Sequence, residues 1–347
     1  MYCDRRMGGT ERWFFSEPPD TNMRIPNWVR KCVVFLAYRD DTGKVYLAGT
    51  GFLVFRPVSD IVGGFVYLVT AAHVIQGIKD KGCDKVFIRI DFKDGTGKWA
   101  ETDVGQWIFH PTDPLVDVAV LQISGQFAGL VAVEPFTLHV MISSSELAEK
   151  GVGVGTEVFL SGLFTEHPGV ERNIPIVRVG NIAATPEEKV KSGRGFIDAY
   201  LVETRSIGGL SGSPVFVHLG LWHKDKGVLK MATSDEGIIY FLGLMQGHWD
   251  SPGLSQADVA SDESQKTEER VNMGIGIVVP AEKIVEVIRH PKIEERNAAE
   301  LEKHANRNLP VQDTASYEEH VFTKEDFDAA LKKVSKRLPP SQSGEEK

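Results

Sequence analysis

The segment Ser206-Ile207-Gly208-Gly209-Leu210-Ser211-Gly212-Ser213-Pro214, followed by the apolar run Val215-Phe216-Val217, decides how the rest of the chain is interpreted. A serine between glycines, on a turn that enters a buried strand, presents one hydroxyl and leaves backbone amides free to hold an oxyanion. Gly209 and Gly212 allow backbone angles that a side chain would forbid. The alternative is an ordinary Gly/Ser/Pro turn between two strands. Other segments of the chain decide between the two.

A serine hydroxyl is a weak nucleophile and needs a base, which a third group holds in the correct tautomer. Of the ten histidines, His73 stands at the end of an apolar strand among small residues, in Leu68-Val69-Thr70-Ala71-Ala72-His73-Val74-Ile75. These small residues leave room for the imidazole to approach the serine turn. We therefore predict that His73 is the base, with a packed or capping histidine as the alternative.

Asp117 is the best candidate for the orienting carboxylate. It leads directly into Val118-Ala119-Val120-Leu121, so its charge lies at the rim of an apolar core and needs a partner. A histidine ring is such a partner, and a Lys or Arg is the alternative. Asp113 competes, but it precedes Pro114 in what reads as an exposed turn, so we place Asp117 ahead of it.

The hydrophobic pattern is that of an all-β protein. About a dozen short β-rich segments, separated by Gly, Pro and Asp, favour a barrel or sandwich over βαβ units. These segments are residues 33–36, 45–47, 51–55, 65–69, 86–92, 107–109, 118–123, 157–160, 176–179, 196–202, 238–244 and 274–279. The preceding residues 1–25 read as an irregular lead-in.

The pattern changes to a helical period after Pro280, and we predict helices over residues 281–289 and 293–306. Residues 324–338 form a further amphipathic candidate, with its apolar residues on one face. That face docks on its own domain or binds a protein partner. The last residues, 341–347, read as disordered.

Composition excludes several classes of protein. The 347 residues carry a formal net charge of −9, and no stripe of Lys and Arg is present, which argues against a nucleic-acid partner. The three cysteines, Cys3, Cys32 and Cys83, have no disulfide-framework spacing. Neither an apolar signal region nor a membrane-spanning run is visible, so we expect a cytoplasmic protein without membrane association.

Three motifs in the order His, Asp, Ser resemble the chymotrypsin-fold (trypsin-like) serine proteases, in their cytoplasmic or bacterial-type branch without disulfides. They are Thr70-Ala71-Ala72-His73, Asp117-Val118-Ala119-Val120-Leu121 and Gly209-Leu210-Ser211-Gly212-Ser213-Pro214. The resemblance implies two packed antiparallel six-stranded β-barrels, over about residues 26–140 and 150–280, in one domain spanning 26–292. A helical extension, 293–347, follows.

The resemblance also implies the chemistry. His73 acts as general base and then acid, Asp117 orients it, Ser211 attacks the carbonyl, and the amides of Gly209 and Ser211 form the oxyanion hole. The expected activity is that of a serine endopeptidase, which cleaves a polypeptide substrate through an acyl-enzyme with neither metal nor cofactor. The alternatives are a catalytically silent binding or scaffold protein on the same fold and an esterase with the same triad.

Two features bear on control and specificity. Digestive relatives carry an Asp immediately before the nucleophile, which pairs with a newly cut N-terminus; here the residue is Leu210, so no such activation is expected. The pocket for the residue before the scissile bond falls by position on Arg205, Ser206, Gln246 and His248. An Arg and a His there favour an acidic or amide side chain in the substrate; the alternative is that Arg205 pairs with Glu203 or points to solvent.

Because nothing after about residue 292 matches the family, we predict that removing residues 308–347 leaves hydrolysis intact. The measurement is peptide hydrolysis by the truncated chain, together with a circular dichroism spectrum. A truncated protein that folds but has lost activity contradicts the prediction and places those residues in the catalytic unit.

Overall fold

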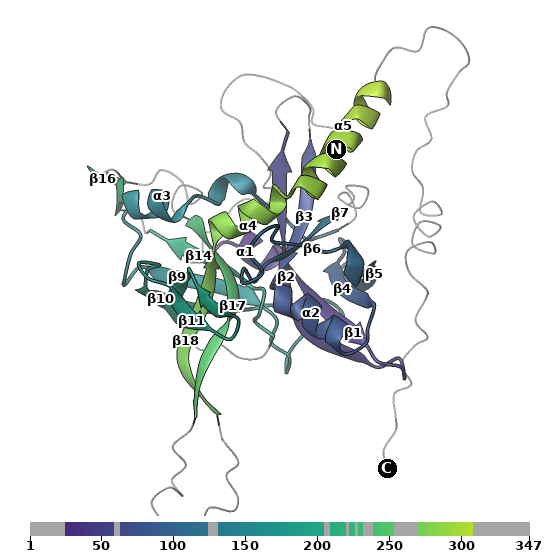
Figure 1. The fold of residues 1–347 in the computed structure, drawn as a ribbon, viewed down its shortest axis with the longest axis horizontal. Coiled ribbons are helices and arrows are strands. Elements are labelled where there is room, and N and C mark those ends of the chain that lie inside the picture. The colour runs from purple at the N-terminus through teal and green to yellow at the C-terminus, as the bar shows by residue number, and fades with distance from the viewer. Residues whose placement is uncertain are drawn as a thin grey trace, which may run out of the picture.

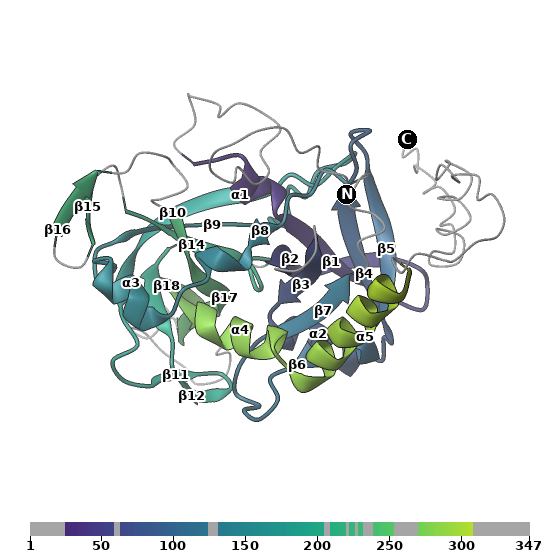
Figure 2. The same ribbon diagram turned by 90° about the horizontal axis from the view of Figure 1, so that it is seen from above.

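The structure, a computed structural model, describes residues 25–58, 63–123, 131–204, 209–219, 222–225, 228–231, 239–252 and 270–307. Two β-structures lie side by side, one built from the first third of the chain and one from the middle (Figures 1 and 2). Few helices accompany them, so the all-β expectation is confirmed.

The first β-structure is an open sheet of eight strands in the order β5-β4-β1-β2-β3-β7-β6, with β8 parallel to β2. The strands are β1 (Val33–Arg39), β2 (Val45–Pro57), β3 (Gly64–Thr70), β4 (Lys85–Asp91), β5 (Gly97–Asp103), β6 (Ile108–Phe109), β7 (Ala119–Ile123) and β8 (Phe136–Thr137). Segments 45–47 and 51–55 form one strand, because Gly49 and Gly51 continue the pairing with β1. The two outermost strands, β5 and β6, do not pair, so this sheet remains open among the described residues.

The second β-structure is a closed six-stranded barrel, as predicted, in the order β10-β13-β18-β17-β14-β9. Its strands are β9 (Glu157–Gly162), β10 (Ile176–Ala184), β13 (Tyr200–Glu203), β14 (Pro214–His218), β17 (Ile239–Pro252) and β18 (Arg270–Pro280). Two hairpins lie outside the barrel: β11 (Val190–Ser192) with β12 (Gly195–Ile197), and β15 (Trp222–Asp225) with β16 (Val228–Met231). The predicted strand 196–202 is therefore divided between β12 and β13.

Aromatic rings join the two β-structures. Phe136 of β8 lies 5.3 Å, centroid to centroid, from Phe216 of β14 and 5.2 Å from Phe241 of β17. Phe52 of β2 also contacts Phe241, at 5.4 Å. Trp28, in the short helix α1 (Trp28–Lys31), packs edge-on against Phe216 at 5.2 Å. Because each such pair contributes about 0.5–1.5 kcal/mol beyond its buried area, this cluster fixes how the two halves meet.

A loop between β9 and β10 crosses from the barrel to the first sheet. The buried Arg89 of β4 donates hydrogen bonds to the backbone carbonyls of Gly169 (2.7 Å) and Val170 (2.6 Å). Asn173 donates its backbone N–H to Asp91 (2.8 Å). Burial lowers the pKa of the Arg89 guanidinium, yet two carbonyls satisfy the group in place of water. We call residues 169–173 the strap.

The longer helices are α2 (Ala72–Asp80), α3 (Ser144–Glu149), α4 (Ala281–Ile288) and α5 (Pro291–Arg307), and two 3₁₀ turns cover Val104–Gln106 and Leu138–Val140. α4 and α5 confirm the two helices predicted after Pro280. α2 was not predicted; it places His73 in a first helical turn instead of at a strand end. None of the helices in the described part of the chain combines the length and apolar character needed to cross a lipid bilayer. The candidate helix 324–338 lies outside the described residues.

Helix α5 packs on the first sheet (Figure 2). Its buried Ile293 contributes to the core, and Glu294 pairs with Arg56 of β2 at 2.7 Å. The buried Asn297 donates to the Tyr67 hydroxyl of β3 (2.8 Å) and accepts a hydrogen bond from Gln122 of β7 (3.0 Å). The helix therefore belongs to the packed body of the protein.

We predict that Asn297→Ala lowers the free energy of unfolding by about 1–3 kcal/mol, because it leaves the buried Tyr67 hydroxyl and the half-buried Gln122 amide without this partner. The measurement is urea unfolding followed by fluorescence. Glu295→Ala, an exposed position on the same helix, serves as the control and is expected to change stability by less than about 0.5 kcal/mol. Equal effects of the two substitutions contradict the packing described here.

Candidate active site

Strand pairing brings His73 and Asp117 together. Thr70, at the end of β3, pairs with Ala119, at the start of β7. His73 lies three residues after Thr70, and Asp117 lies two residues before Ala119. Both residues therefore lie just beyond the Thr70–Ala119 pair, at the same edge of the sheet.

The Asp117 carboxylate contacts His73 with both oxygens. Oδ2 lies 2.6 Å from His73 Nδ1, and Oδ1 accepts the His73 backbone N–H at 2.8 Å. The Asp117 side chain is fully buried, whereas the His73 side chain is 40% exposed. Since a carboxylate accepts hydrogen bonds, the proton of a neutral His73 ring resides on Nδ1. Nε2 is then left as the acceptor, which is the form that a general base requires.

The loop that carries Ser211 is pressed against the first sheet. Ser211 accepts the Thr50 backbone N–H at its carbonyl (2.9 Å). Gly212 has φ +85°, and a Cβ there would collide with the Thr50 carbonyl and the Thr70 hydroxyl. A glycine is thus required at this position both by conformation and by space. Thr70 is the strand end that leads to His73, so the structure brings Ser211 to the same edge as the Asp117–His73 pair.

The Ser211 hydroxyl points to a backbone carbonyl. Its Oγ donates to the carbonyl of Gln246 at 3.1 Å, and no Ser211–His73 hydrogen bond is formed between these two described residues. Gln246 sits at an irregularity where the β17–β18 register shifts between Met245 and Gly247. Such bulges re-aim backbone and side-chain groups, and this one turns the Gln246 carbonyl toward the serine.

Gly209, the predicted oxyanion residue, has φ +95° and lies against Leu163 and Thr165. Its carbonyl accepts the Thr50 hydroxyl (2.8 Å), and that hydroxyl accepts the Leu163 backbone N–H (2.8 Å). Leu210, which follows, is fully buried in the second barrel's core. Apolar packing and the Thr50 hydroxyl therefore hold this part of the loop.

The predicted substrate-pocket residues divide into two groups. Gln246 is mostly buried and His248 half-buried, both on β17. Arg205 and Ser206 lie outside the described residues.

Sequence reasoning missed two residues of the site, Thr50 and Arg194. The glycines on either side of Thr50 are a signal of close backbone approach, whereas nothing around Arg194 indicates its position.

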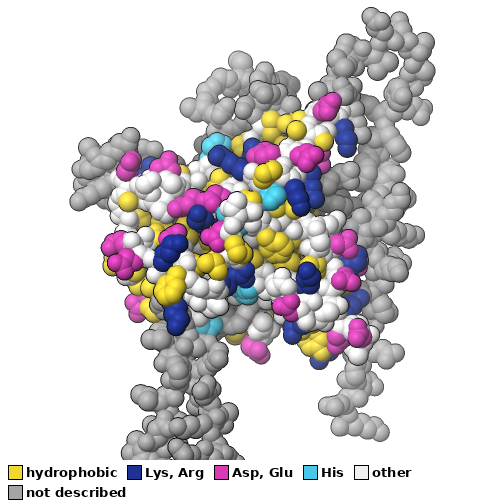
Figure 3. Space-filling view, viewed as in Figure 1, with side chains coloured by type: hydrophobic (Ala, Val, Ile, Leu, Met, Phe, Trp, Pro, Cys, Tyr) yellow, Lys and Arg dark blue, Asp and Glu magenta, His cyan; other side chains and the backbone are white. Residues whose placement is uncertain are grey.

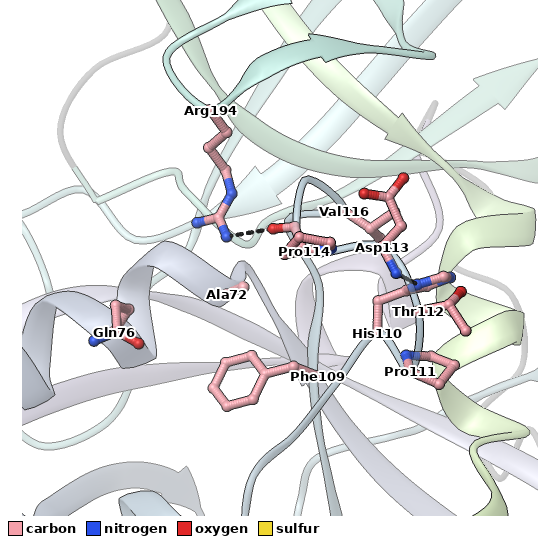
Figure 4. A pocket seen from close by; sticks show the side chains of 10 residues that line it. All are labelled: Ala72, Gln76, Phe109, His110, Pro111, Thr112, Asp113, Pro114, Val116 and Arg194. Carbon is pink, nitrogen blue, oxygen red and sulfur yellow. Dashed lines mark hydrogen bonds between the residues drawn. The ribbon is translucent and has the colours of Figure 1, made fainter.

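Arg194 reaches the site from the β11–β12 hairpin. It borders a hollow of about 310 Å³ beside α2, whose other walls include Gln76, Phe109 and Pro114 (Figure 4). The hollow lies beside the Asp117–His73 pair, since Ala72 and Val116, each next to one of the two, also line it.

Acidic and basic side chains intermingle over the face of the molecule drawn in Figure 3. In the described ranges, no group of three or more His, Cys, Asp or Glu side chains is arranged to hold a metal ion. Cys32 and Cys83, the two cysteines within those ranges, are both free.

Comparison with known proteins identifies a family model and solved structures of low sequence identity. Residues 49–221 match the family model described as "Trypsin-like peptidase domain". No curated protein sequence gives a significant match to the chain.

Solved structures with a similar fold include the MamO protease domain from Magnetospirillum magneticum (15% identity, TM-score 0.45, covering 76% of this chain and 99% of that one). Human heparin binding protein is also similar (11%, 0.40, 82% and 95%), as is the Drosophila Grass clip serine protease of the Toll pathway (13%, 0.43, 79% and 72%). At these identities the similarity is one of fold alone. The matched segment contains His73, Asp117 and Ser211, and the chain therefore belongs to the trypsin-like peptidase family, with an all-β fold of the chymotrypsin type.

Proposed function

We propose that this protein is a serine endopeptidase that hydrolyses peptide bonds through an acyl-enzyme. The observation that carries the proposal is the fully buried Asp117 carboxylate, which contacts both the ring Nδ1 and the backbone N–H of His73. This contact sets the tautomer and the orientation that a base needs in order to activate a serine.

In the proposed reaction, Ser211 Oγ attacks the carbonyl carbon of the scissile peptide bond while its proton passes to His73 Nε2. The tetrahedral intermediate then collapses, the C–N bond breaks, and the amine leaves with the proton from Nε2. Water hydrolyses the resulting ester with His73 as base again. Asp117 stabilises the imidazolium in both steps without itself taking the proton.

The Ser211 hydroxyl must turn before it reacts, because in this structure it donates to the Gln246 carbonyl. Rotation about its Cα–Cβ bond, between staggered rotamers, is enough to redirect the proton from that carbonyl toward His73. Catalytic hydrogen bonds are often long or absent without substrate, so this resting contact is compatible with the proposed activity.

The backbone N–H groups of Gly209 and Ser211 are proposed to hold the developing oxyanion. The positive φ of Gly209, its contacts with Leu163 and Thr165, and the Thr50 hydrogen bond to its carbonyl support a fixed conformation there. Preorganised donors of this kind are valuable because they do not have to reorganise during the reaction.

The alternatives remain a silent scaffold on the same fold and an esterase. A polypeptide substrate, an acidic or amide side chain before the scissile bond, a cytoplasmic location and a partner for residues 324–338 stay predictions from the sequence.

We predict that a fluorophosphonate probe forms a single adduct with the wild-type protein: Ser211 Oγ bonds to phosphorus, fluoride leaves and His73 takes the proton. Ser211→Ala abolishes the adduct, and His73→Ala slows its formation by about 10²–10⁴-fold, the contribution of a general base. Intact mass spectrometry and labelling kinetics make the measurement. Hydrolysis of a peptide library, compared with simple esters, then separates the peptidase from the esterase.

Ser213→Ala is the matched control for the labelling, since Ser213 lies in the same loop but is fully buried. It is expected to keep the adduct. A folded wild-type protein that takes no adduct favours the scaffold over the enzyme.

We predict that Thr50→Val lowers kcat/KM about tenfold to a hundredfold, as displacement of a catalytic group does. The substitution keeps the shape of the side chain but leaves the Gly209 carbonyl and the Leu163 N–H without their shared partner. Thr50→Ser retains the hydroxyl and is expected to retain most of the activity. Steady-state kinetics with the best library peptide measure both variants. Equal activities of the Thr50→Val variant and the wild-type enzyme count against a role of the hydroxyl in the oxyanion turn.

A further inference from the structure

Arg194 joins the second barrel's outer hairpin to the segment that carries Asp117. Its Nη2 donates to the backbone carbonyl of Pro114 at 2.9 Å (Figure 4). Its Nη1 lies 3.5 Å from Asp117 Oδ1. The Arg194 side chain is 31% exposed, whereas the Asp117 side chain is fully buried.

The hairpin around Arg194 is built to place it. The Ser192 hydroxyl donates to the Gly195 carbonyl (2.9 Å) and accepts the Arg194 backbone N–H (3.1 Å), which closes the turn between β11 and β12. Gly195 has φ +132°, and a Cβ there would lie 3.2 Å from the Leu115 side chain. The turn thus packs directly on Leu115, two residues before Asp117.

The charge of Asp117 has few partners. A buried carboxylate is costly unless it is compensated, and a neutral His73 ring offers a hydrogen bond but no charge. Among the described residues, Arg194 is the permanent cation that lies within 4 Å of this carboxylate. Four other charged side chains line a small cavity together with Asp117 but form no ion pair with it, namely Asp113, Lys189, Asp198 and Lys283.

We propose that Arg194 is a positioning residue for the Asp117–His73 pair: its guanidinium holds Oδ1 of Asp117 in place, so that Oδ2 remains directed at His73 Nδ1. The proposal rests on the proposed role of His73 as the base. The trypsin-like motifs in this sequence give no indication of such a cation, and it comes from a hairpin that pairs with no other strand among those described.

A cation at this distance also opposes a second positive charge on the imidazole. Removing this cation is therefore expected to move the acidic limb of the pH–rate profile to higher pH. If Arg194 only stabilised the β11–β12 hairpin, its removal would change the stability of the protein but not the position of the acidic limb.

The experiment compares Arg194→Met, Arg194→Lys and the control Lys191→Met, which removes an exposed cation from the same hairpin. The rate of fluorophosphonate labelling is measured from pH 5 to 9, and the His73 Nδ1 proton is observed by NMR in ¹⁵N-histidine-labelled protein. For Arg194→Met we expect the midpoint of the acidic limb to rise by about one pH unit and the Nδ1 proton resonance to shift. Arg194→Lys is expected to restore most of both values, and Lys191→Met to change neither.

A wild-type midpoint and an unchanged Nδ1 resonance in folded Arg194→Met overturn the proposal, as does an equal shift in Lys191→Met. Thermal unfolding of each variant shows that it is folded. If the wild-type protein takes no label at all, the proposed function fails, whereas the NMR comparison still tests whether Arg194 acts on the Asp117–His73 pair.

Discussion

The site depends on Thr50, a fully buried residue in the middle of β2. Its backbone N–H binds the Ser211 carbonyl, its hydroxyl bridges Leu163 and Gly209, and its carbonyl accepts the Thr70 hydroxyl. Every polar group of this one residue is thus used, and each contact leads to a different part of the site. Because buried polar groups must be satisfied, Thr50 positions the Ser211 loop, the turn at Gly209 and the strand that leads to His73.

The aromatic cluster between the two β-structures holds them together around Thr50. Phe136 contacts rings of both halves, and it comes from β8, the short strand that runs parallel to β2. Protein interiors are close-packed, so a shift of one side chain is passed on to its neighbours. A site divided between two β-structures, with His73 and Asp117 on one and Ser211 on the other, therefore keeps its geometry without a covalent bridge between them.

Sequence patterns predicted the short strands, the two helices after Pro280 and the pairing of His73 with Asp117, and the resemblance to trypsin-like proteases implied the closed second barrel. They did not predict α2, because Ala72-His73-Val74-Ile75 suits both a helix and the end of a strand. They did not predict the contact of Ser211 with Gln246, which depends on a register shift between β17 and β18. They did not predict the position of Arg194 either. That position depends on how the β11–β12 hairpin packs on Leu115, and a local sequence pattern carries no information about such a long-range contact.

The strap has a consequence for how the molecule can be divided. The β4 guanidinium of Arg89 is buried against carbonyls of Gly169 and Val170, which belong to the loop between β9 and β10 of the second barrel. If the chain were cut between the two β-structures, the first fragment would hold the Arg89 cation without its carbonyl partners. The second fragment would hold the carbonyls of the 169–173 loop without the Arg89 donors. An open sheet and a closed barrel could be regarded as two modules, but here the β9–β10 loop of the barrel supplies groups that Arg89 of the sheet needs, so we expect the two to fold and unfold together.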